Sequence, residues 1–222
     1  MNDLAVAITG SDLPAHLNLD SSRGNESVGS QLTIPRIKLI QKMSSEVDKN
    51  HPEFVKGAEV GMFVNTLTKE LYDHMYVISL NFKVQFTLWR DINKGGGFGG
   101  TFDSEADAIA EQATKDNPAE WEVVENHSHL IVVINEETNE LGDTPVIFDF
   151  TKSKLATSRS WNSKLSLQSG DRFASVWKIT SKTTQSRTGQ QYENLDVDLE
   201  GWATEAHFKA AEAMYETHST IR

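Results

Sequence analysis

The strongest constraint on the fold of this chain is a run of alternating apolar and polar residues between positions 75 and 90. Its even positions hold apolar side chains, namely Tyr76, Ile78, Leu80, Phe82, Val84, Phe86 and Leu88. Its odd positions are polar apart from two, and they hold Val77, Ser79, Asn81, Lys83, Gln85, Thr87 and Trp89. A period of two over this length predicts a long antiparallel strand with one buried and one solvent-facing side. We therefore expect Trp89 on the solvent-facing side, next to Lys83 and Gln85.

Shorter patterns predict the rest of the sheet and the helices. Residues 32–40 and 61–66 are candidate strands, and Pro35 restricts the first to an edge position or a strand start. Apolar runs that flank turn residues predict two hairpins, at 129–150 and 172–202. Helical patterns occur at 103–116, at 151–170 as a short helix, and at 203–219. These elements predict an α+β fold with a largely antiparallel twisted sheet, long hairpins and two to three helices.

Composition limits the domain organisation and the compartment. Residues 1–30 are rich in Ser, Gly, Asn and Asp without an apolar period, so we expect a disordered N-terminal arm before a single domain at 31–222. The chain has no cysteine, which excludes disulfides and thiolate chemistry and suits a reducing cytoplasm. No stretch approaches the roughly 18 to 20 apolar residues of a membrane span, so we expect no membrane partner. The sequence leaves open whether the chain forms a homo-oligomer.

The charges are segregated along the chain. The net charge of −11 argues by itself against a nucleic-acid binder, because phosphate contacts need cations. However, residues 151–190 hold eight Lys and Arg against one acid, whereas residues 101–150 hold thirteen acids against one Lys. A ligand experiences the local field within roughly 8 to 10 Å. The basic segment is therefore predicted to meet an anion.

The alternating run ends in a glycine-rich stretch, "LWRDINKGGGFGG", at residues 88–100. It satisfies G-x-G-x-x-G, but a stretch so dense in glycine matches by accident, and a Rossmann strand would be apolar on both faces. No G-K-[ST] follows, so it is not a Walker loop. Three interpretations remain: a nucleotide cradle, a passive flexible loop, and a flap that grips a ligand with Phe98 as its large side chain.

Candidate catalytic and metal-binding motifs are weak. "ENHSH" would place Glu125, His127 and His129 on one face of a strand, where two histidines and a carboxylate can bind a metal. A solvated edge strand is the commoner explanation of this pattern. Serine is abundant, but no G-x-S-x-G motif occurs. We therefore expect no enzyme, no catalytic residue, no metal and no cofactor.

The basic segment suits single-stranded nucleic acid. It combines its cations with fifteen Ser and Thr residues and three large aromatic side chains, and exposed aromatics stack bases without demanding sequence. Trp161 and Trp177 are expected in the core, which leaves Trp89 as the better stacking residue. The predicted DNA-binding residues are Lys83, Trp89, Arg90, Lys94, Phe98, Lys152, Lys154, Arg159, Lys164, Arg172, Lys178, Lys182 and Arg187.

Three motifs resemble a family of tailed-phage proteins that includes the single-stranded-DNA-binding RNA polymerase cofactors (Drc) of lytic short-tailed phages. They are "LTIPRIKLIQ", "GMFVNT" and "LWRDINKGGGFGG", within residues 32–100. The resemblance implies binding of unwound promoter DNA in the host cytoplasm and recruitment of a phage-encoded RNA polymerase. It also implies a fold unlike the standard OB barrel.

Two other functions remain open at this point. The acidic 101–150 segment suits a phage structural or host-interaction protein that binds a partner through its acidic surface. The glycine-rich stretch leaves a nucleotide-dependent enzyme as a further alternative.

Overall fold

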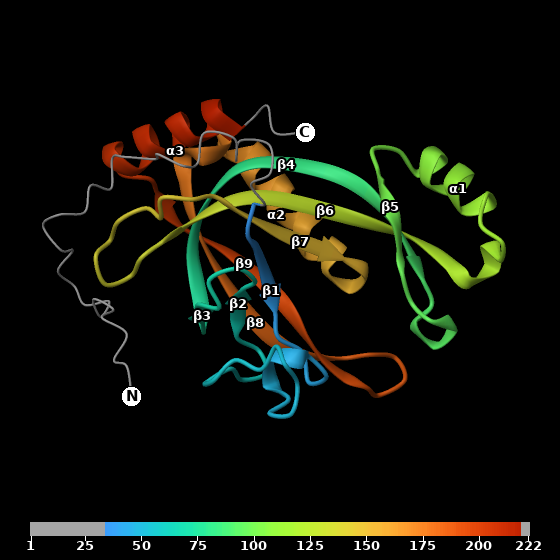
Figure 1. Cartoon of the computed structure of the whole chain (residues 1–222). Coiled ribbons are helices and arrows are strands. Elements are labelled where there is room, and N and C mark those ends of the chain that lie inside the picture. Colours follow the sequence, from blue (N-terminus) through green and yellow to red (C-terminus); the bar gives the residue numbers. More distant parts are fainter. Residues whose placement is uncertain (1–33, 219–222) are drawn as a thin grey trace, which may run out of the picture. The chain divides into compact units, whose positions relative to one another are not determined.

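The computed structural model describes residues 34–218, which form one sheet with helices on both of its faces (Figure 1). The sheet order is β3-β2-β1-β7-β6-β4-β8-β9, and β5 pairs with β4 outside this path. All pairings are antiparallel except that of β1 with β7, and the curled sheet does not close into a barrel. The predicted α+β class is therefore confirmed, whereas the predicted arm at 1–30 lies outside the described residues. The strands are β1 Arg36–Leu39, β2 Phe63–Asn65, β3 Leu71–Tyr72, β4 His74–Arg90, β5 Phe98–Phe102, β6 Trp121–Ile134, β7 Val146–Thr151, β8 Ser175–Gln185 and β9 Gln191–Trp202.

The three α-helices of residues 34–218 lie where the sequence patterns place them. α1 spans Glu105–Ala113 and begins at Ser104, whose hydroxyl accepts the Asp107 amide proton at 3.1 Å as an N-cap. α2 spans Leu155–Gln168, which makes it longer than the short helix expected. α3 spans Glu205–His218. None of the helices in residues 34–218 is long and apolar enough to cross a membrane.

A β-bulge in β4 decides which side chains share a face. Ser79 pairs with Ile131 of β6 and Asn81 pairs with Leu130, so Leu80 is an extra residue without a partner. Val77 and Ser79 consequently share a face with Phe82 and Leu88, although their positions differ in parity. The expectation that the even positions of 75–90 share one face is therefore wrong. Beyond the bulge the predicted grouping holds, and one face carries Asn81, Lys83, Gln85, Thr87 and Trp89. We call this the Trp89 face and the opposite one the α2 face.

The core consists of two clusters on opposite faces of β4. Met75 and Val77 pack on the α2 face with Trp161 and Trp177. Ile78 and Leu80 pack on the other face with a cluster that includes Ala211 of α3. The first half of β4 is thus buried on both sides, so the single solvent-facing side expected for the whole strand exists only after the bulge. Trp161 and Trp177 are core residues, as predicted.

Side chains protect the long edge of the sheet at β9. An unpaired edge strand exposes backbone groups that can pair with another chain. The outward carbonyl oxygen of Glu193 accepts from Gln41 Nε2 at 2.9 Å, that of Leu195 from Thr157 Oγ1 at 3.2 Å, and that of Val197 from Lys164 Nζ at 2.7 Å. Lys164 therefore stabilises the sheet edge.

We predict that Trp161→Ala lowers the free energy of unfolding by about 3 to 5 kcal/mol, because it empties a fully buried site between α2 and the sheet. Trp202→Ala is the matched control, since Trp202 is 65% exposed, and it should change stability by less than about 0.5 kcal/mol. Chemical denaturation of both variants measures the difference. Equal stability losses would contradict this assignment of the core.

Candidate nucleic-acid interface

The end of β4 carries an exposed aromatic pair. The rings of Trp89 and Phe98 lie 5.1 Å apart between centroids, and the two residues are 47% and 58% exposed. The indole of Trp89 is held against the sheet, because its Nε1 donates to Thr87 Oγ1 at 3.1 Å. Thr87 Oγ1 donates in turn to the Val124 carbonyl oxygen at 3.3 Å. The indole is therefore oriented by the sheet while its ring remains accessible.

The glycine-rich stretch forms the turn of a β-hairpin. Asp91 Oδ1 accepts from the Asn93 amide at 2.8 Å, and the Arg90 amide donates to the Gly97 carbonyl at 2.9 Å. Gly95, Gly96 and Gly97 have φ angles of 99°, 63° and 141°, which favour glycine. β5 follows directly and separates the glycines from α1, so the strand–loop–helix context of a dinucleotide cradle is missing.

Gly99 allows the β4–β5 hairpin to close against its neighbours. A Cβ atom at this position would lie 2.7 Å from Trp121 Cζ3 and 2.9 Å from Leu88 Cδ2. Such distances are too short, and Leu88 is fully buried, so a side chain at 99 would displace the strand that carries Phe98.

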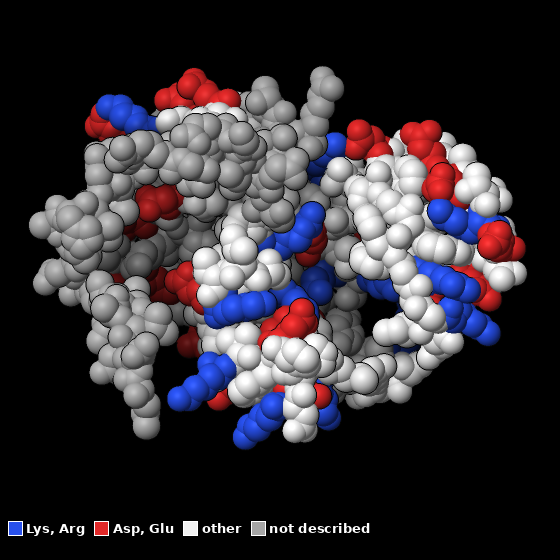
Figure 2. Space-filling view, in the orientation of Figure 1, with Lys and Arg blue, Asp and Glu red and all other residues white. Residues whose placement is uncertain are grey.

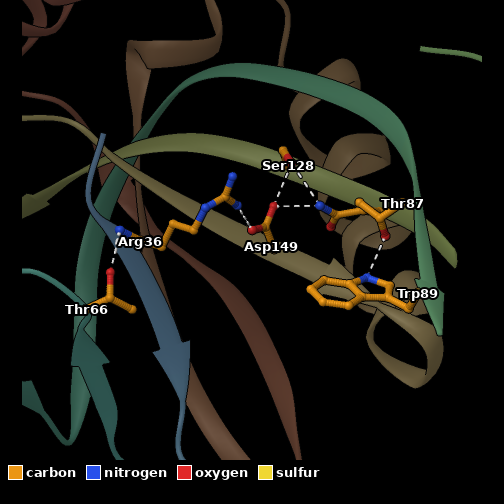
Figure 3. A network of polar contacts seen from close by, with 7 residues as sticks. Arg36, Thr66, Thr87, Trp89, Ser128 and Asp149 are labelled. Carbon is orange, nitrogen blue, oxygen red and sulfur yellow. Dashed lines mark hydrogen bonds and ion pairs between the residues drawn. The ribbon is translucent and has the colours of Figure 1, made fainter. Parts of the chain in front are cut away.

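A polar row continues from Trp89 across the sheet (Figure 3). Strand pairing places Thr87, Asn126, Ser128 and Asp149 on the Trp89 face, and Arg36 of β1 lies at the far end. Asp149 Oδ1 accepts from Ser128 Oγ at 2.6 Å and from Asn126 Nδ2 at 2.9 Å. Its other carboxylate oxygen, Oδ2, forms an ion pair with Arg36 Nη1. Hydrogen bonds and the ion pair thus join side chains from β6, β7 and β1, and the bonded pair of Trp89 and Thr87 on β4 lies on the same face.

The described helices leave this part of the Trp89 face uncovered. α2 packs on the opposite face, because Ser158 and Trp161 contact the histidines of β6 there. α1 also lies on the opposite face. Lys115, which lies just after this helix, sits 5.1 Å from the Trp121 ring, and Trp121 pairs with Arg90, whose side chain points away from the Trp89 face. α3 covers the Trp89 face only around Ile78 and Leu80.

Most of the predicted cations are paired with acids. The ion pairs are Lys83–Asp103 at 2.7 Å, Arg90–Glu120 at 2.6 Å, Lys152–Glu122 at 3.2 Å, Arg159–Glu125 at 3.0 Å, Lys164–Asp198 at 3.4 Å and Lys182–Asp196 at 2.9 Å. They are distributed over both faces and do not form one basic surface. Lys94 and Arg187 are exposed at the two hairpin turns, and within residues 34–218 neither has an ion-pair partner.

Three predicted residues lie in other environments. Arg172 precedes β8 in a short 3₁₀ turn, so it does not share a strand face with Lys178 and Lys182 as the alternation suggested. Burial lowers the pKa of Arg172 to about 10. Lys178 lies 5.1 Å from the Tyr76 ring, and contact with the Tyr76 hydroxyl raises the pKa of this lysine. Burial lowers the pKa of Lys154.

Figure 2 shows positive and negative side chains interspersed over the face seen in Figure 1. Acidic atoms gather over α1, and Lys and Arg atoms border a hollow to the right of centre. The helix contributes Glu105, Asp107 and Glu111 to this acidic surface.

A directional chain of hydrogen bonds runs beneath the sheet on the α2 face. Arg172 only donates, so its Nη2 bonds to Nδ1 of neutral His129 at 3.1 Å. His129 Nε2 must then donate to Ser158 Oγ at 2.7 Å, and Ser158 donates to His127 Nδ1 at 2.8 Å. His127 Nε2 donates to Glu125 Oε1 at 2.9 Å. The donor and the acceptor of each hydrogen bond follow from Arg172, which can only donate.

This series of hydrogen bonds does not form a catalytic or metal site in the described structure. Glu125, His127 and Ser158 have the connectivity of a hydrolytic triad, but Ser158 is completely buried and out of reach of a substrate. Residues 34–218 contain no group of three or more His, Asp or Glu that could hold a metal ion. The "ENHSH" residues do share a face, as the pattern indicated, but they face the core and α2.

Sequence patterns do not predict the polar row. Arg36, Asn126, Ser128 and Asp149 come from three strands and meet only through strand pairing. The available signal was weak: Asp149 is the single charged residue of β7, whereas Arg36 begins β1, which also contains Lys38.

We predict that acid destabilises the protein through His129. Burial, with Arg172 next and His127 after it, lowers the pKa of His129 well below 6.5, so the unfolded chain binds the proton more readily. Stability from this group is complete above about pH 6.5 and falls as pH decreases below it. Thermal unfolding of the wild type and His129→Gln between about pH 8 and 5 tests this. The variant should lose less stability on acidification, and equal losses would contradict the assignment.

We predict that Gly99→Ala lowers the free energy of unfolding by about 1 to 3 kcal/mol, because its methyl group overlaps Trp121 and Leu88. Gly201→Ala is the control, since no heavy atom lies within 4 Å of the added Cβ there. Denaturant titrations compare the two, and an unaffected Gly99→Ala protein would show that the hairpin does not need this close approach.

Comparison with known proteins identifies one family. A family model described as Pam3 phage gp34-like protein matches residues 7–221. No curated protein and no solved structure matches significantly.

Proposed function

The chain belongs to the Pam3 phage gp34-like family, and we propose that this bacteriophage protein binds single-stranded DNA with the Trp89 face of its sheet. The family membership confirms the phage origin that the sequence resemblance implied. DNA binding, action in the host cytoplasm and a role in transcription are the parts that we propose.

The observation that carries this proposal is the exposed pair of Trp89 and Phe98. Large aromatic side chains are normally buried in part, and a pair that exposes about half of its surface is available for stacking. Base–aromatic stacking contributes roughly 1 to 3 kcal/mol per base and tolerates any sequence. Thr87 holds the indole in place, so little side-chain entropy is lost on binding.

The same geometry favours a single strand over a duplex. Bases in a duplex are stacked and paired, so their faces are not available to Trp89 and Phe98, whereas an unpaired strand can present them. The half-buried hydroxyl of Ser128 in the adjacent row suits contacts to sugars and phosphates.

Electrostatic attraction contributes less than the basic segment suggested. The cations at 83, 90, 152, 159, 164 and 182 already have acidic partners, and the net charge is −11. Counterion release requires cations that are free to contact phosphate. We therefore propose that stacking contributes most of the affinity for single-stranded DNA, and that this affinity depends only moderately on salt.

We further propose that the protein is a transcription cofactor that binds unwound promoter DNA and recruits a phage-encoded RNA polymerase. The sequence resemblance supports this role, and the acidic surface of α1 is a candidate contact for the polymerase. Co-purification of the polymerase with the wild type, and its loss when Glu105 and Asp107 are replaced by Gln, tests the contact.

A second candidate function is a phage structural or host-interaction protein. The acidic side chains over α1, opposite to the Trp89 face, favour it. A stoichiometric protein partner that depends on α1, together with no binding of oligonucleotides, would support this function instead.

We predict that Trp89→Ala and Phe98→Ala each reduce affinity for a mixed-sequence single strand by about 1 to 3 kcal/mol, because each removes one stacking surface. The slope of affinity against salt should change little, since neither residue is charged. Fluorescence anisotropy with a labelled oligonucleotide measures both quantities.

Trp202→Ala is the control, because Trp202 is also exposed but lies at the end of β9. Its affinity should equal that of the wild type. An equal loss in all three variants, or equal binding of duplex and single strand, would contradict the proposed interface.

A further inference from the structure

The polar row crosses the sheet obliquely, because it advances along the strands as it passes from β4 to β1. From Trp89 on β4 it passes Asn126 and Ser128 on β6 and Asp149 on β7, and it ends at Arg36 on β1 (Figure 3). Trp89 pairs with Glu122 of β6, whereas Arg36 is level with Leu130, so the two ends lie eight residues apart along β6, which is about 26 Å, and three strand spacings apart across the sheet, which is about 14 Å. The resulting path of about 30 Å matches about nine nucleotides at about 3.4 Å each, or fewer in a stretched strand.

We propose that single-stranded DNA lies along this row, with a base stacked on Trp89 and a phosphate bound by Arg36. This inference rests on the proposed function and adds its path and a phosphate-binding residue that lies outside the basic segment. It names Arg36, which the charge pattern of the sequence did not single out.

The packing of the sheet favours a path across the strands. DNA that followed β4 from Trp89 toward its N-terminus would reach the region around Ile78 and Leu80, where α3 packs on the same face. DNA that crosses the sheet meets hydroxyl, amide and guanidinium groups instead. Within residues 34–218, no helix lies over that path.

Arg36 is suited to bind a phosphate. Its side chain is 50% exposed, and Asp149 contacts it through Nη1 alone, so Nε and Nη2 remain available as donors. Asp149 is itself held by Ser128 and Asn126, which orients the guanidinium toward the row. The arrangement positions a cation at the end of a polar path that starts with an aromatic ring.

Asn126 adds a second observation within the row. It is 7% exposed, its Nδ2 donates to Asp149, and its Oδ1 is a buried acceptor without a donor from residues 34–218. Buried polar atoms are rarely left unpaired, so this oxygen indicates a donor from outside residues 34–218.

The test uses the full chain and variants at the two ends of the ion pair. Affinity for a short labelled single strand of mixed sequence is measured from about 0.05 to 0.2 M salt. Arg36→Gln should bind about five-fold more weakly at about 0.1 M salt, and its salt slope should fall by about 0.7, the loss of one phosphate contact. Asp149→Asn should bind more tightly, because it removes the negative charge and keeps the acceptor for Ser128 and Asn126.

Two further variants serve as controls for the loss of charge at Arg36. Arg36→Lys keeps the charge and should recover most of the salt slope, and circular dichroism of each variant checks the fold. Lys209→Gln on α3 removes an exposed, ion-paired cation away from the row and should leave binding unchanged.

The outcomes separate the two proposals. If the wild type binds and Trp89→Ala weakens it, but Arg36→Gln and Asp149→Asn bind like the wild type, the path along the row is wrong and the proposed function stands. If Asp149→Asn weakens binding as much as Arg36→Gln, the pair has only a structural role and the inference is overturned. If the wild type does not bind single strands, both proposals fall.

Discussion

The continuity of β4 through the sheet is the constraint on which the rest of the structure depends. This 17-residue strand pairs with β5, β6 and β8, so one segment positions both core clusters and the aromatic pair. The bulge at Leu80 allows this, because one extra residue exchanges the faces midway. Before it, the strand is buried on both sides; after it, one side is polar and ends in Trp89. Without the bulge, Trp89 would face α1 and α2.

Folding cancels most of the charge segregation that is visible along the sequence. Hairpin pairing places Lys182 of β8 beside Asp196 of β9, and Arg159 of α2 reaches Glu125 of β6. Arg172 is used in the interior, where it orders the hydrogen-bond chain that links α2 to the sheet. A local excess of cations in the sequence is therefore no measure of the field that a ligand meets.

The fold could largely be predicted from local patterns, because strong alternation, a capped helix and paired apolar runs each specify their element. The interpretation of β4 failed at one residue, since a bulge depends on the partner strand and has no local signature in Leu80. β5 was missed because Gly99 and Gly100 have no strand propensity, and their small size matters only against Trp121 and Leu88. In the candidate site, the exposure of Trp89 followed from its parity, whereas the row from Asn126 to Arg36 depends on pairing between strands far apart in the sequence.

The central proposal is that nucleic acid contacts the aromatic pair at the end of β4. The most direct test is photochemical cross-linking of the wild-type protein to a single strand that carries halogenated uracil, followed by mass spectrometry of the cross-linked peptide. The expected modified residue is Trp89 or Phe98. A cross-link confined to Trp202 or to the β8–β9 hairpin, in a complex that demonstrably forms, would contradict it.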